Sequence, residues 1–160
     1  MRIIAGLVLL ASACTVRAQS ADWKQLEFLL GNWTGAAGEK DTPNGAGQGA
    51  FSFEPNLNKR IIVRRNNATY NSGASHDDLM VIYTEGGTRA IYFDTEGHVI
   101  RYNVSAPSVN RVVFESDGTQ PGPKYRLSYW LDGGSLNGKF EIAAPASEFK
   151  TYMSWTSKRN

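Results

Sequence analysis

Cysteine is almost missing from this sequence: Cys14 is the only one among 160 residues. A lone thiol cannot form an intramolecular disulfide or a cysteine metal centre. Cys14 also lies near a segment that we expect to be removed, so the processed chain would have no thiol nucleophile. Its stability must then come from the core alone. About 140 residues can supply that core, because a chain of this length buries roughly two-thirds of its unfolded surface.

An excess of charge of one sign is also missing. The whole chain has 17 Lys and Arg residues against 15 Asp and Glu residues. Arg2 and Arg17 fall within residues 1–18, and without them 15 basic side chains face the 15 acidic ones. A chain without a basic stripe has little attraction for the phosphate backbone. The composition therefore predicts no nucleic-acid partner.

Long apolar runs are confined to the N-terminus and predict export. Arg2 is followed by the apolar stretch 3–11, which is too short to span a bilayer. Val16-Arg17-Ala18 then places small or apolar residues three and one before a cut at Gln19. We predict a signal peptide over 1–18 and a periplasmic or secreted protein, with no transmembrane segment.

A second cleavage site competes with the first. Leu10-Ala11-Ser12-Ala13 precedes Cys14 and resembles a bacterial lipoprotein box, which would leave a lipid anchor on Cys14. Ala11 stands where leucine is usual in such boxes. We favour free secretion over lipid anchoring.

The remaining chain predicts one short helix followed by ten strands. Asp22 is a suitable N-cap, and apolar residues at helical spacing follow it up to Gly31. The pattern then changes to period two, broken by Gly-, Pro- and Asn-rich turns such as Pro55-Asn56. The expected strands are 32–37, 47–54, 59–70, 78–84, 88–94, 98–105, 109–116, 123–131, 136–143 and 148–157.

Short turns in chain order favour an up-and-down antiparallel meander, and closure would remove its exposed edges. We therefore predict an all-β fold: a single closed or nearly closed barrel over 19–160, with the helix capping one end. The loosest stretch, 38–49, is interpreted as a loop, with a lid as the alternative.

Two motifs resemble known families. A helix running into Gly31-Asn32-Trp33 resembles the Gly-x-Trp signature of lipocalin-like (calycin-type) barrels. Ten strands are more similar to the fatty-acid-binding proteins and nitrobindins of that group. Residues 28–35 and 92–98 also resemble exported bacterial domains of unknown function. The resemblance implies that a basic residue, Lys158 or Arg159, packs over Trp33. The Arg-x-Tyr clamp of fatty-acid-binding proteins is absent.

The inner face of the barrel is expected to be aromatic. Inward tyrosines need hydrogen-bond partners, which a ligand or water in a cavity can supply. A ten-stranded barrel usually leaves such a cavity, although plain core packing is the alternative. Arg64 would face inward or lie at the rim, and an inward Arg64 would anchor an acidic headgroup. The candidate ligand-binding residues are Trp33, Phe53, Arg64, His98, Tyr102, Tyr125, Tyr129 and Phe140.

Only two histidines are present. His98 has the phase of Ile100 and Tyr102, so it could ligate haem iron or hydrogen-bond a ligand. The alternative is a rim histidine bonded to Asp94 or Glu96. His76-Asp77-Asp78 could bind a hard cation weakly, but we favour a solvated turn and assign no metal ligand.

Enzymatic signatures are weak. The sequence has no Gly-x-Ser-x-Gly, His-Glu-x-x-His or phosphate-loop motif, and no catalytic residue is assigned. The leading hypothesis is an exported protein that binds a small apolar or amphiphilic molecule, such as a lipid, pigment, quinone or haem. No cofactor can be identified from the residues. The alternatives are a hydrolase or isomerase using His98 and Asp94, and a ligand-free barrel that acts through a protein partner.

Overall fold

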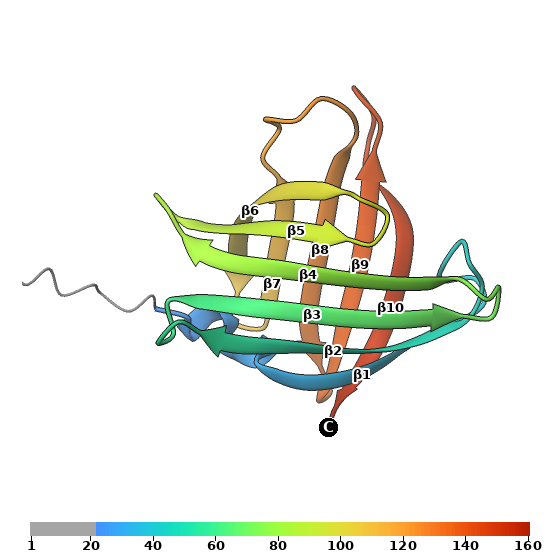
Figure 1. The fold of residues 1–160 in the computed structure, drawn as a ribbon, viewed down its shortest axis with the longest axis horizontal. Helices are drawn as coiled ribbons and strands as arrows, with labels where there is room; N and C mark the ends of the chain where they lie inside the picture. Colours follow the sequence, from blue (N-terminus) through green and yellow to red (C-terminus); the bar gives the residue numbers. More distant parts are fainter. Residues whose placement is uncertain (1–21) are drawn as a thin grey trace, which may run out of the picture.

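Residues 22–160 form a closed barrel of ten antiparallel strands in the computed structural model (Figure 1). Each strand pairs with its neighbours in the chain, and β1 pairs with β10 to close the sheet. The predicted all-β fold is confirmed. The expected signal peptide and Cys14 lie outside the described residues. The strands are β1 (Gly31–Ala37), β2 (Gly47–Asn56), β3 (Ile61–Tyr70), β4 (Ser75–Thr84), β5 (Thr88–Asp94), β6 (Val99–Ser108), β7 (Arg111–Ser116), β8 (Lys124–Asp132), β9 (Ser135–Ala143) and β10 (Lys150–Arg159).

Nine of the ten strands differ from their predicted bounds at one end or both, and two of these differences matter here. β2 runs through the expected Pro55-Asn56 turn, and the chain reverses instead at Leu57, Asn58 and Lys59, which all have positive φ. β4 begins at Ser75 rather than Asp78, because the pairing of β3 with β4 extends to Thr69 and Ser75. The second difference is important for the site, since it brings His76 into the barrel wall.

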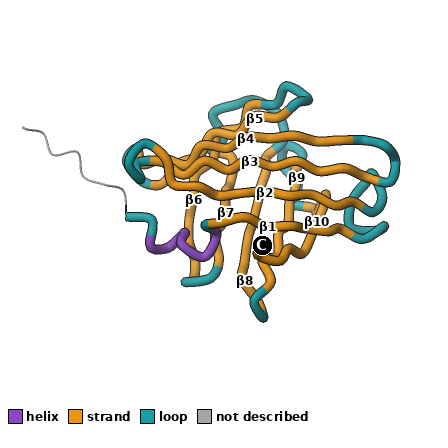
Figure 2. The backbone as a smooth tube through the Cα atoms, turned by 60° about the horizontal axis from the view of Figure 1, so that its bottom comes forward, coloured by secondary structure: helices purple, strands orange, loops and turns teal. Residues whose placement is uncertain are grey.

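The helix before β1 is a 3₁₀ helix, η1 (Lys24–Leu29), and not an α-helix. It starts after Trp23, and Asp22 accepts a hydrogen bond from the Lys24 N–H without being the N-cap. Such helices are used in short pieces because their geometry is poorer than that of an α-helix. Figure 2 shows that this segment is the only helix in the described part of the chain. Among residues 22–160, no helix has the length and apolar character needed to cross a membrane.

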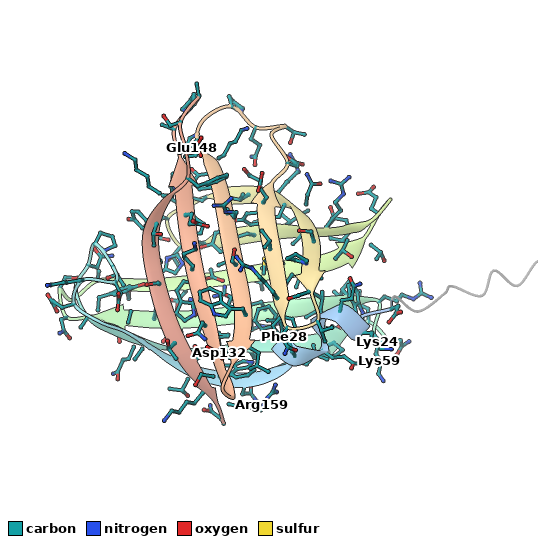
Figure 3. The ribbon with its side chains drawn as sticks, turned by 180° about the vertical axis from the view of Figure 1, so that it is seen from behind. Lys24, Phe28, Lys59, Asp132, Glu148 and Arg159 are labelled. Atoms are coloured by element: carbon teal, nitrogen blue, oxygen red, sulfur yellow. The ribbon has the colours of Figure 1, made fainter. Side chains whose placement is uncertain are left out.

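The Gly-x-Trp segment joins η1 to the closure of the barrel. Trp33 is 1% exposed, and its indole N–H donates to the Leu29 carbonyl at 2.8 Å. The Arg159 guanidinium lies 4.3 Å from the Trp33 ring centroid, so the expected basic residue over this tryptophan is Arg159. Arg159 also donates to the Phe28 carbonyl at 3.1 Å, and both residues lie at the same end of the barrel in Figure 3.

Gly31 is required for this arrangement. Its φ is +115°, and a Cβ there would lie 2.6 Å from an Arg159 guanidinium nitrogen. Only glycine tolerates that backbone conformation without strain.

The packed core fills the half of the barrel next to η1. Its largest side chains are fully buried and make edge-to-face aromatic contacts, such as that between Phe53 and Tyr129 at 5.5 Å between ring centroids. Edge-to-face pairs stabilise beyond the apolar area they bury. The other half of the barrel is not filled, and the candidate site lies there. The core includes Leu29, Trp33, Phe53, Ile62, Met80, Ile82, Val112, Phe114, Tyr129 and Leu136.

Candidate functional site

A cavity of about 410 Å³ occupies the barrel end away from η1. It reaches the ends of β1 and β3 and the loop between β1 and β2, from which Thr42, Pro43 and Asn44 line it. This loop is tied to the barrel, because the Ser154 N–H donates to the Asp41 carbonyl at 2.9 Å. The stretch 38–49 was expected to be a loop; β2 already begins at Gly47, and the loop that remains forms one edge of the cavity.

The two sides of the cavity differ in chemistry. One wall comes from β8, β9 and β10 and is apolar and aromatic; Tyr125 and Phe140 stack there with centroids 5.9 Å apart. Its members are Tyr125, Leu127, Phe140, Ile142, Met153 and Trp155. The opposite wall comes from β3, β4, β5 and the turn before β6, and it is polar. Its members are Arg64, Asn66, His76, Asp78, Tyr92, Asp94, Glu96 and His98.

Five of the eight predicted binding residues line this cavity: Arg64, His98, Tyr102, Tyr125 and Phe140. The other three, Trp33, Phe53 and Tyr129, share the inward phase but lie in the packed core and do not line the cavity. Period-two patterning identifies which face a residue is on. It does not say how far along the barrel the packing ends.

Arg64 points inward and is buried, at 4% exposure. Its guanidinium forms an ion pair with the buried carboxylate of Asp78 and lies over the rings of Phe51 and Phe53. Burial opposes the charge most strongly, but Asp78 together with Tyr129 and Tyr92 offsets this and raises the pKa of Arg64 above its ordinary value. Asp78 thus lies beside the Arg64 guanidinium, in the position predicted for the acidic headgroup of a ligand.

Two buried polar atoms near this ion pair lack partners. Within residues 22–160, neither the Arg64 Nε nor the Tyr129 hydroxyl has a hydrogen-bond partner. Burial raises the pKa of Tyr129 to about 12, so its hydroxyl stays protonated and able to donate. Tyr102 is 2% exposed and also lines the cavity.

His76 lies at the centre of the polar wall. Its Nε2 is 3.0 Å from the Tyr92 hydroxyl and 3.3 Å from an Asp78 carboxylate oxygen. Its Nδ1 is 3.0 Å from the Glu96 carboxylate. The hydrogen bond to Asp78, helped by Glu96 and opposed by partial burial, raises the pKa of His76 to about 9.

The expected solvated turn at His76-Asp77-Asp78 is therefore wrong. All three residues belong to β4, so their side chains alternate: His76 and Asp78 line the cavity, while Asp77 is exposed and bonds to Asn67 outside. The sequence pattern indicates that these two side chains face inward, because His76 and Asp78 share the phase of the buried Met80 and Ile82. The predicted strand begins three residues too late, so His76 falls outside it and its inward phase is not recognised.

Asp94 and His98 form a second pair at the rim. The His98 Nδ1 and its backbone N–H each lie 2.8 Å from an Asp94 carboxylate oxygen. The His98 side chain is 58% exposed, which agrees with the rim alternative. Burial alone would raise the pKa of Asp94, but hydrogen bonds from His98 and Tyr92 lower it.

The pair has no nucleophilic side chain beside it among the described residues. Nucleophilic catalysis needs a hydroxyl or thiol within hydrogen-bond reach of the base. Among the described residues, none makes a hydrogen bond to the free Nε2 of His98. The pair can move a proton or hold a polar ligand group, and within residues 22–160 it is not part of a catalytic triad.

Comparison with known proteins supports the fold. No protein family model matches the chain, and no curated protein matches it. Among solved structures, the chain is similar to Rv2717c from M. tuberculosis, with a TM-score of 0.61. The likeness is one of fold. Sequence identity is 14%, and the match covers 89% of this chain and 99% of Rv2717c. Two such distant sequences can share a barrel without sharing a ligand.

Proposed function

We propose that this protein is an exported, lipocalin-like binding protein that holds a small amphiphilic molecule in its barrel. The cavity with two unlike walls supports this most directly. The wall from β8 to β10 would bind the apolar part of the ligand at roughly 25 cal/mol per Å² of buried apolar surface. The polar wall and the Tyr102 hydroxyl would orient its polar group. Arg64 is part of that wall with its charge already neutralised by an ion pair.

Export is the second part of the proposal. It rests on the sequence of residues 1–18, which lie outside the described residues. The Gly-x-Trp geometry with Arg159 over Trp33 supports the lipocalin-like part. The cavity argues against the ligand-free alternative, because a barrel acting only through its surface has no need of an unfilled interior. The hydrogen bond between His98 and Asp94 leaves the enzyme alternative open. In that alternative the two residues would transfer a proton, without a nucleophilic side chain beside them.

A matched pair of variants tests the proposal. Ala68 lines the cavity, and its neighbour Thr69 is exposed on the same strand. Ala68→Trp fills the cavity from β3, whereas Thr69→Trp adds the same side chain outside. We expect the neutral dye N-phenyl-1-naphthylamine to bind the parent protein and to lose at least tenfold in affinity in Ala68→Trp. Thr69→Trp should change the affinity less than twofold.

Fluorescence titration of the dye measures this, and circular dichroism confirms that both variants fold. No dye binding to the parent protein, or an equal loss in both variants, contradicts a ligand site in the cavity.

A further inference from the structure

We propose that His76, Asp94 and Glu96 bind one divalent transition-metal cation in the polar wall of the cavity. Each of the three can offer one ligand atom, and these atoms all lie within 4.8 Å of one another. The three residues come from different segments: β4, the end of β5 and the turn that follows it. The sheet brings them together because Asp78, two residues after His76, pairs with Asp94.

The distances suit coordination after a small rearrangement. In a tetrahedral site with bonds of about 2.1 Å, two ligand atoms lie about 3.4 Å apart. The His76 Nδ1 and the Glu96 carboxylate are 3.0 Å apart. Glu96 is in an exposed turn and can rotate without disturbing the core. A shift of the carboxylates by about 1 Å would complete the set.

Hydrogen bonds to neighbouring side chains already fix the orientation of two of the three ligands. Metal-binding histidines usually donate their second ring nitrogen to a carboxylate, which fixes the ring and its tautomer. The His76 Nε2 faces Asp78 at 3.3 Å, leaving Nδ1 toward Glu96. Asp78 is itself fixed by Arg64 and by the Asn66 amide at 3.0 Å. Asp94 is held by His98.

Two further observations favour a cation and a bound polar atom here. Three carboxylates line the cavity, those of Asp78, Asp94 and Glu96, and Arg64 is the only lysine or arginine among the lining residues. The Arg64 Nε is a separate observation: it is buried in the wall of the same cavity without a hydrogen-bond partner among the described residues. Water on a bound metal, or a polar ligand group, could accept its hydrogen bond.

The donor set defines the class of metal. One imidazole nitrogen and two carboxylates suit Zn²⁺, Mn²⁺, Co²⁺ or Fe²⁺ better than Ca²⁺ or Mg²⁺, which prefer oxygen alone. Three protein ligands leave at least one coordination position open toward the cavity. A polar group of the occupant of the cavity could take that position, but the metal site does not depend on such an occupant.

Metal titration tests the inference. The full chain is used without an affinity tag and with Cys14→Ser, so that neither the tag nor the thiol binds metal. Isothermal titration with Zn²⁺ at pH 8 should show one equivalent bound, and Co²⁺ should give a visible absorption band. His76→Gln and Glu96→Gln should each weaken Zn²⁺ binding at least tenfold.

Asp77→Asn is the matched control, since it removes a carboxylate from the outer face of the same strand. It should change the affinity less than twofold. The absence of binding, or equal weakening by Asp77→Asn, overturns the metal site. Thermal melts verify that each variant is folded. Because the dye titration contains no metal, it can fail while metal binds, and metal binding can fail while the dye binds.

Discussion

At the scale of single residues, the buried ion pair between Arg64 and Asp78 dominates the polar wall. Both side chains are almost fully buried, at 5% and 3% exposure. A pair of this kind adds little stability over an apolar replacement, but losing one partner leaves an uncompensated buried charge. The pair matters for the site because Asp78 also holds His76.

We predict that Asp78→Asn destabilises the protein by about 3–5 kcal/mol, because Arg64 stays buried and charged. The double variant Arg64→Met/Asp78→Leu should recover most of this loss. The exposed neighbour variant Asp77→Asn should stay within about 0.5 kcal/mol of the parent. Urea unfolding gives the three free energies of unfolding. A loss below about 1 kcal/mol in Asp78→Asn would show that the ion pair is solvated rather than buried.

At the scale of elements, the β8–β9 hairpin carries a charged cluster on its outer face. Glu141 on β9 accepts from Arg126 on β8 at 2.8 Å and lies 2.9 Å from the Lys139 ammonium. The hydrogen bond from Arg126, opposed by burial and helped by Lys139, lowers the pKa of Glu141 below its ordinary value of 4.5. A carboxylate whose pKa is lowered by folding stabilises the folded state at pH values above its unfolded pKa.

Glu141→Gln should therefore cost about 1 kcal/mol at pH 7, since both cationic partners are partly exposed. The difference from the parent should shrink as the pH falls below about 4.5 and vanish once the folded carboxyl is protonated. Thermal melts between pH 3 and pH 7 measure it, with Glu85→Gln in an exposed turn as control. A difference that stays constant over this range contradicts the ion-pair account.

The elements also show what could be predicted from the sequence. Alternation and turn residues identify all ten strands, because a strand with one buried face has a period of two. The basic residue over Trp33 was implied by the family resemblance, which left Lys158 and Arg159 open, and the structure has Arg159 there. The 3₁₀ form of η1 does not follow from a local motif, since short helices are decided by tertiary contacts such as that of Trp23 with the Lys59 carbonyl.

The site was predicted only in part, for a physical reason. Tyr102 was predicted from its inward phase, which is visible in one strand, whereas Arg64 was predicted to face inward or to lie at the rim. The cluster of His76, Asp94 and Glu96 depends on the register between β4 and β5, which the turn lengths and pairing set. A strand start placed at Asp78 instead of Ser75 removed His76 from the inner face.

At the scale of the whole molecule, the barrel is packed at the η1 end and open at the other. Aromatic residues on the same inward faces fill one half and line the cavity in the other. Ten strands enclose more space than these side chains fill, which is typical of barrels that hold ligands. The central claim is that a small amphiphilic molecule occupies this space.

Native mass spectrometry of the protein purified from its own host tests this claim most directly. The parent protein should carry a non-covalent small-molecule adduct that is released on denaturation. The adduct should persist in Thr69→Trp and be lost in Ala68→Trp, because only the second substitution fills the cavity. Bare protein in all three samples, or an adduct that Ala68→Trp retains, would contradict the account.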